Sequence, residues 1–305
     1  MFGFILRRLA VAIPSLLLLI IISFVLMHSA PGGPFTQERA LPPQVLANLD
    51  AKYGLDQPLI VQMWTYIVGI VTRFDFGPSF IYPDLSVNDI ISQGFPVTLT
   101  YGAIGFTLSV LFGVMLGIVA AIRHNTWIDT AAVGVSIGAQ VLPNFVIAPI
   151  LVLVFTLWLR WLPGGGWGGW PYWVMPIIAL TLSHMASIAR LTRSSMLEVL
   201  GSNHIRTARA KGLSERAVIM RHALKPAMLP VISYLGPLFV TMITGSVVVD
   251  MYFSTGGIGR SFVDSALSRD YAVMMGITIL VGALTIFFNL LVDVLYAWID
   301  PKIIY

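Results

Sequence analysis

The chain contains no cysteine among its 305 residues. This absence excludes structural disulfides, thiolate metal sites and a cysteine nucleophile together. The five histidines, at 28, 124, 184, 204 and 222, do not show the spacing of a zinc site. Charge is also scarce, because 10% of the residues are charged, against about 25% in soluble globular proteins. With 57% hydrophobic residues and a mean hydropathy of +0.86, the chain is predicted to cross a membrane several times.

The usual sequence signatures of ATP hydrolysis and zinc-dependent proteolysis are also lacking. The closest approach to a phosphate-binding loop is the segment 256–261, which has the wrong glycine spacing and no lysine. No H-E-x-x-H motif occurs. We therefore predict a non-catalytic chain that binds no metal or cofactor itself, so that any energy input comes from another subunit.

Six segments are long and apolar enough to cross about 30 Å of hydrocarbon as helices. They are 9–29, 98–122, 130–158, 174–192, 230–251 and 273–299. Continuous apolar runs favour helices over the alternating strands of a membrane barrel. The predicted fold class is an all-α membrane protein with six transmembrane helices. Pro143 and Pro149 predict a kink in the third of them.

Lysine and arginine are distributed unevenly between the two predicted sides of the membrane. Six of the 18 lie on one side: Arg39, Lys52, Arg73, Arg160, Arg260 and Arg269. The other twelve lie on the side that holds both termini and the segment 190–229. Because cytoplasmic loops carry the excess of basic residues, both termini are predicted to be cytoplasmic.

Three regions are expected along the chain: an N-terminal transmembrane helix at 1–30, an extracytoplasmic lobe at 31–97, and a five-helix core at 98–305. The lobe has helix-like apolar spacing at 45–53 and 60–71. Two interpretations of it stay open, a cap on the membrane surface and a docking surface for a soluble partner.

The third predicted span has one polar face, formed by Ser136, Gln140 and Asn144 at helical spacing. A polar stripe in lipid faces protein or water, so these residues are candidates either for a translocation path or for hydrogen bonds between helices. The pairs Gly113-x3-Gly117 and Gly134-x3-Gly138 predict close helix packing.

The segment 190–229 carries eight basic residues and two acidic ones. We expect Asn203 to cap a short helix that runs to Lys211, and Gly212 to end it in the left-handed conformation. Ser214 is expected to cap a second helix that ends before Pro226. The small residues Thr207, Ala208 and Ala210 would allow a soluble partner to approach this projecting pair of helices closely.

This segment resembles the cytoplasmic signature E-A-A-x3-G-x9-I-x-L-P of membrane subunits of binding-protein-dependent ABC importers. The aligned positions are Arg206, Thr207, Ala208, Gly212, His222, Leu224 and Lys225, with arginine in place of the glutamate, histidine in place of the isoleucine, and the proline one place late at Pro226. Further blocks, such as 205–213, 257–260, 269–271 and 289–302, are similar to the peptide and nickel group of these permeases. Finer features at 34–43 and 162–167 look like the first membrane subunit of a bacterial oligopeptide importer.

The resemblance implies a type I importer permease of the bacterial inner membrane, which translocates oligopeptides together with a second permease. It also implies two cytoplasmic ATPase subunits, which hold ATP and Mg²⁺, and a periplasmic peptide-binding protein, with no role for nucleic acid. The residues it assigns to coupling with the ATPase are Ile205, Arg206, Thr207, Ala208, Arg209, Gly212, Leu213, His222 and Leu224. Dipeptides, glutathione or nickel remain alternative cargoes. A proton-driven carrier that uses Asp293 or His184, and a purely structural scaffold, are the other classes considered.

Overall fold

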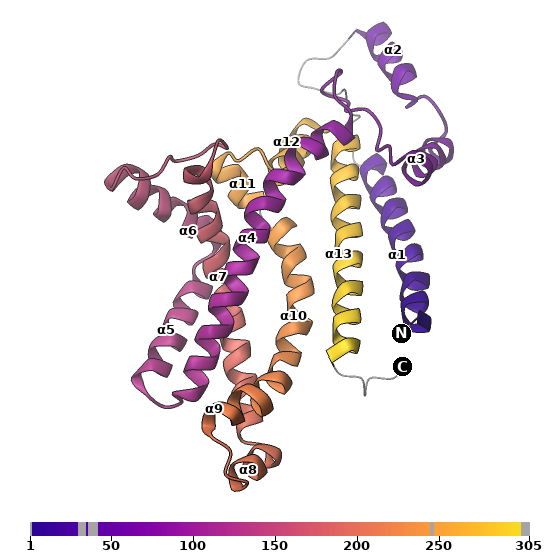
Figure 1. Ribbon diagram of the computed structural model, residues 1–305. Coiled ribbons are helices and arrows are strands. Elements are labelled where there is room, and N and C mark those ends of the chain that lie inside the picture. The colour runs from indigo at the N-terminus through magenta and orange to yellow at the C-terminus, as the bar shows by residue number, and fades with distance from the viewer. Residues whose placement is uncertain (1, 30–34, 36–41, 245–246, 300–305) are drawn as a thin grey trace. The chain divides into compact units, whose positions relative to one another are not determined.

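A computed structural model describes residues 2–29, 35, 42–244 and 247–299. Every regular element in these ranges is helical, apart from one isolated antiparallel bridge between Pro78 and Ser86 (Figure 1). The helices are α1 Phe2–Ser29, α2 Pro43–Tyr53, α3 Leu59–Arg73, α4 Val87–Ile122, α5 Trp127–Val141, α6 Asn144–Leu151, α7 Trp170–Leu200, α8 Asn203–Ala210, α9 Glu215–Ala217, α10 Leu224–Thr244, α11 Val247–Phe253, α12 Ile258–Ser268 and α13 Tyr271–Ile299. Two π-helical stretches, η1 Val152–Trp158 and η2 Val218–Ala223, complete the set. The predicted all-α class is confirmed.

Among the described residues, five helices are long and apolar enough to cross a membrane. They are Arg7–Ser29, Val87–Ile122, Trp170–Leu200, Glu215–Phe253 and Tyr271–Val294, the fourth of which includes the undescribed positions 245–246. Each overlaps a predicted span. The remaining predicted span, the third along the chain at 130–158, consists instead of shorter apolar helices.

Proline breaks the third predicted span completely, whereas the sequence predicts only a kink. Helix α5 ends at Val141, and Leu142 is extended, with φ −82° and ψ 112°. The residue before a proline is disfavoured in the helical conformation, so Pro143 imposes this break. A new helix, α6, then begins at Asn144 and passes into the wider turns of η1 after Pro149.

The described residues form two compact units, one made of 99–244, 247–254 and 288–299 and the other of 2–29, 35, 42–98 and 255–287. In the first unit, α7 packs against α5 and α10. Glycine lets α4 approach α7 closely, because a Cβ on Gly117 would lie 2.5 Å from the carbonyl oxygen of Ala189. The predicted packing role of Gly113 and Gly117 is thus confirmed, whereas a Cβ on Gly134 or Gly138 would meet nothing within 4 Å in this chain.

In the second unit, the buried carboxylate of Asp270 holds a loop of the lobe against the start of α13. It accepts hydrogen bonds from the Ser79 hydroxyl and from the backbone N–H groups of Phe80 and Ile81, at 3.2 and 3.3 Å. It also accepts the N–H of Val273 at 3.3 Å, which caps α13. One carboxylate therefore stabilises both the loop and the first turn of a membrane helix.

We predict that Gly117→Ala destabilises the purified chain by about 1–3 kcal/mol, since the added methyl group would lie 2.5 Å from both the carbonyl oxygen of Ala189 and Cβ of Thr192, atoms that backbone movement alone could shift. The measurement is the thermal unfolding midpoint in detergent. Gly134→Ala is the matched control, because its Cβ enters open space and alanine is the better helix former, so its midpoint stays equal or rises. Equal midpoints for the Gly117 variant and the native chain would contradict the packing.

Candidate functional site

The candidate coupling segment forms a compact projection between α7 and α10, which we call the knob and define as residues 201–223. Its first helix, α8, begins after Ser202, whose φ and ψ of −75° and 158° make it the N-cap. The prediction that Asn203 is the N-cap is therefore wrong by one residue. The Ser202 hydroxyl donates to the carbonyl oxygen of Val199 at 2.6 Å and lies 2.9 Å from Nδ1 of His204, so it joins α7 to α8.

The end of α8 is built as predicted around Gly212, which has φ +77°. The N–H of Leu213 donates to the carbonyl oxygen of Ala208 at 3.4 Å, and the N–H of Gly212 donates to that of Arg209 at 2.9 Å. These are the two bonds of a Schellman motif, which satisfies the last carbonyls of a helix and requires a left-handed residue where Gly212 stands.

The second half of the knob is more continuous than predicted. Ser214 caps α9 as expected, by accepting the N–H of Ala217 at 3.4 Å. The helix does not end before Pro226, because η2 leads directly into α10. Pro226 therefore lies inside a continuous helical segment, and the wide π turns before it let the chain pass its ring.

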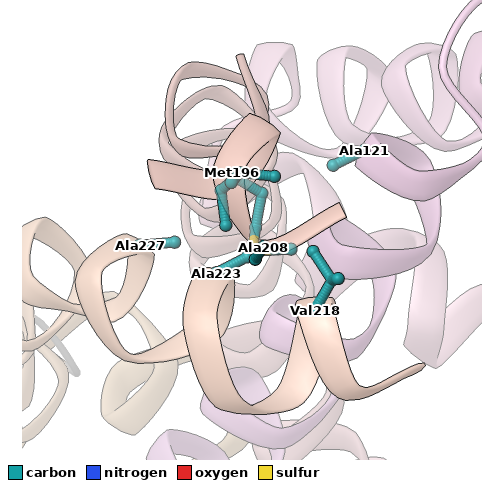
Figure 2. Packing of buried hydrophobic residues seen from close by; sticks show 7 residues of the cluster. Ala121, Met196, Ala208, Val218, Ala223 and Ala227 are labelled. Carbon is teal, nitrogen blue, oxygen red and sulfur yellow. The ribbon is translucent and has the colours of Figure 1, made fainter. Parts of the chain in front are cut away.

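The inner face of the knob packs against its own chain. Ile205 and Ala208 of α8 are buried at 0% and 5% exposure, together with Met196 of α7 and Val218 of η2. Ala121, Ala223 and Ala227 complete this cluster (Figure 2). Ile205 and Ala208 are thus not available to a partner, and the expected close approach over Ala208 is wrong, since helical spacing places it on the inner face.

The outer face of the knob carries the remaining sequence-predicted coupling residues. Arg206, Thr207, Arg209, Gly212, Leu213 and His222 are exposed, as is Ala210, while Leu224 is half-buried. Nε of Arg209 donates to Oε1 of Glu215 at 2.7 Å and a second nitrogen donates to Oε2 at 3.2 Å, which clamps the corner between α8 and α9. These bonds hold the pKa of Arg209 above its ordinary value. Because the pair is exposed, it orients the corner and adds little stability.

Sequence reasoning missed an ion pair at the root of the knob. Asp129 of α5 is buried and accepts two hydrogen bonds from Arg193 of α7, at 2.6 and 2.8 Å. The N–H of Asn125 and the ring of His124 also lie 3.1 Å from the Asp129 carboxylate. Arg193 therefore locks the α4–α5 turn to α7 and is not one of the free cations of the segment 190–229. An aspartate in the first turn of a predicted membrane helix is the signal that was available.

A second buried carboxylate was also missed. Asp250 of α11 accepts a hydrogen bond from the hydroxyl group of Tyr101 of α4, and both residues are 0% exposed. Trp167 packs its edge on Tyr101 with ring centroids 6.1 Å apart and stacks on Trp173 at 5.3 Å. Asp250 stands at the last turn of a predicted span, where a carboxylate needs a partner, so its position was a usable signal.

The candidate path residues are placed only in part. Ser136 is buried on α5 and lines a small cavity with Ala189, Arg190 and Arg193 of α7. The side chains of Gln140 and Asn144 lie outside the described residues. Ser136 is also the centre of a G-x-S-x-G pentapeptide at 134–138, but this lies inside a helix and not at the strand-to-helix turn of a nucleophile elbow. In the described ranges, no three His, Asp or Glu residues come together as metal ligands.

Residues 113–305 match the family described as "Binding-protein-dependent transport system inner membrane component", and residues 1–102 match the N-terminal model of such components. The chain belongs to this family. The family members are membrane permease subunits, so this chain is a multi-pass transport component of the inner membrane and not a catalyst.

The permease is 55% identical over 307 residues to the oligopeptide transport system permease protein OppB of Salmonella typhimurium, with 100% of both chains covered. It is 54% identical to OppB of Escherichia coli over the same length, also with full coverage. The dipeptide transport system permease protein DppB of Bacillus subtilis is 43% identical over 289 residues, which cover 95% of this chain and 94% of the relative.

Two solved structures resemble the permease in fold. A chain of the MetNI methionine ABC transporter in an inward-facing conformation has a TM-score of 0.57 at 14% identity, with 69% of this chain and 96% of that chain covered. A chain of an amino acid ABC transporter solved with histidines has a TM-score of 0.53 at 16% identity, with coverages of 71% and 95%. Both are ABC importers, so the permease has the type I importer fold.

We predict that Gly212→Ala loosens the corner of the knob by about 1 kcal/mol, because a residue with a Cβ is disfavoured at positive φ. Hydrogen–deuterium exchange of the peptide that spans 203–217 should accelerate severalfold. Gly201→Ala is the control, since Gly201 has φ −81° and its added Cβ would meet only ordinary contacts at 3.5 Å. Unchanged exchange in the Gly212 variant would contradict the left-handed assignment.

Proposed function

We propose that this permease forms part of the translocation path for oligopeptides in an ATP-driven importer. The observation that carries the proposal is 55% identity over the full length to an oligopeptide permease. Identity that extends through the lobe and every span favours a common cargo class as well as a common fold. Dipeptides are the second candidate cargo, because a dipeptide permease is 43% identical over nearly the whole chain. Neither glutathione nor nickel is favoured by a specific observation.

The knob is the proposed contact with the ATPase subunits. Its inner face is rooted in α7 and α10 through Met196 and Ala227, while its outer face presents Arg206, Thr207 and Ala210 to solvent. A rigid element with a buried root and an exposed face transmits displacement, whereas a mobile loop absorbs it. Opening and closing of an ATPase pair below the membrane would therefore move α7 and α10.

The remaining partners follow from this assignment. A second permease subunit completes the path, two ATPase subunits hold ATP and Mg²⁺, and a periplasmic peptide-binding protein delivers the cargo. Both termini and the knob face the cytoplasm, which the excess of lysine and arginine on that side supports. Residues 31–97 form the periplasmic lobe between the first helix and the core at 98–305. Ser136, with its neighbours Gln140 and Asn144, is the proposed polar lining of the path.

We expect peptide uptake by the assembled importer to require ATP and to persist when an uncoupler collapses the proton gradient. His184→Gln and Asp293→Asn should keep uptake within about twofold of the native rate, because neither carries a coupling proton in this mechanism. The measurement is accumulation of labelled tri- to pentapeptides and of dipeptides in proteoliposomes. Uphill uptake by the isolated permease, or loss of uptake with the proton gradient, would contradict the proposal.

Two neighbouring alanines on opposite faces of α8 test the coupling surface. We expect Ala210→Trp to leave the thermal midpoint of the chain unchanged and to lower ATP-driven uptake at least tenfold, because it obstructs an exposed contact. Ala208→Trp should instead lower the midpoint by several degrees, since it overfills the cluster around Met196. Copurification of the ATPase subunits is the second readout. Normal uptake and normal copurification with the Ala210 variant would rule out this face as the contact.

A further inference from the structure

Helix α3 of the lobe carries an apolar stripe that the described part of the chain leaves exposed. Ile60, Trp64, Val71 and Phe74 are 71%, 67%, 64% and 75% exposed. The spacings of four and seven residues place Ile60, Trp64 and Val71 on one face of α3, and Phe74 follows the last residue of the helix with φ +52°. Solvent-exposed apolar stripes of this length normally mark an interaction surface.

A neighbouring face of α3 fixes the position of this helix along a membrane helix. Ile70 packs with Ile20 of α1 and Ile279 of α13, and the ring of Tyr66 lies 6.3 Å from that of Phe24 of α1. Figure 1 shows α3 beside the end of α1 that is remote from the N-terminus. The apolar span of α1 is Arg7–Ser29. At 1.5 Å per residue, Phe24 lies about 7.5 Å inside the end of this span, and Ile20 lies deeper, at about 13.5 Å.

The depth of Phe24, which lies beside Tyr66 of α3, is that of the bilayer interface. Helices that lie in the interface bury their apolar face about 5–10 Å into the boundary between headgroups and acyl chains. On α1, Ile22, Val25 and Leu26 are also exposed at this level, as expected for a helix that faces lipid.

The remaining side chains of α3 fit a lipid surface. Tryptophan, as at position 64, is enriched at the interface because its ring is apolar and its N–H is polar. Arg73, exposed at the last turn, can extend its charge to a lipid phosphate. Thr65 and Thr72 are exposed on a flank of the helix, about 100° from Trp64 and Val71, where water would be expected.

We propose that α3 lies in the plane of the membrane interface and that phospholipid covers its stripe. The lobe then rests on the bilayer through this helix, and the stripe is not a docking surface for a soluble protein. The proposal is independent of cargo and of coupling, because it depends only on the depth at which α3 is held against α1.

The absence of cysteine makes each introduced thiol a unique label. The full-length chain, reconstituted into nanodiscs of phosphatidylethanolamine and phosphatidylglycerol, would carry a nitroxide at Trp64→Cys, Thr65→Cys, Val71→Cys or Thr72→Cys. Power saturation with oxygen and with a water-soluble nickel chelate reports lipid and water exposure. We expect the labels at 64 and 71 to be accessible to oxygen and protected from nickel, and the adjacent labels at 65 and 72 to show the reverse.

Other outcomes overturn the proposal. Nickel access at 64 and 71 equal to that at 65 and 72 would place the stripe in water. Protection from both reagents would mean protein cover, and protection that appears only when a periplasmic binding protein is added would mean docking.

A second measurement does not depend on labelling. Brominated lipids should quench part of the tryptophan fluorescence of the native chain, and that part should fall in Trp64→Phe. Equal quenching in the two proteins would also overturn the proposal.

Discussion

Close packing against α7 is the constraint on which the first unit depends. This helix of 31 residues is long enough, at about 1.5 Å per residue, to cross the bilayer and continue into the knob. Gly113 and Gly117 let α4 approach its backbone, Arg193 binds the α5 carboxylate, and the Ser195 hydroxyl donates to the carbonyl oxygen of Ala227 in α10 at 2.8 Å. Van der Waals packing and hydrogen bonds must hold these helices together, because lipid offers no hydrophobic drive for their association.

Helix α7 also connects the knob to the apolar helices of the first unit. The knob is not an appended loop, since Met196 of α7 lies in the cluster that buries Ile205 and Ala208 (Figure 2). The Schellman motif and the Arg209–Glu215 pair both hold the corner between α8 and α9. In the proposed coupling, a force on the outer face would be delivered to α7 and α10 together, and α7 would carry it toward Ser136 through its contacts with α5.

Local rules predicted the parts of the structure that local chemistry determines. Apolar runs located the spans, Gly212 and Ser214 marked the turns of the knob, and glycine spacing found one close helix contact. Pro143 and Pro226 show the limit of such rules, because one proline ended a helix and the other was accommodated by a π stretch. Which outcome occurs depends on the packing of the neighbouring turns, and sequence periodicity does not contain that information.

The contacts between distant segments could not be predicted in this way. Asp129 and Arg193 are separated by 64 positions, and Tyr101 and Asp250 by 149. The orientation of Ala208 depended on whether its own chain or a partner covers that face of α8, which only the tertiary structure decides.

The π stretch η2 adds a last consequence. Each residue advances a helix by about 100°, so the azimuth of the knob relative to α10 depends on the number of residues in η2. Loss of a single residue from η2 would rotate the outer face of the knob by about 100° about the axis of α10, although every side chain of that face would remain.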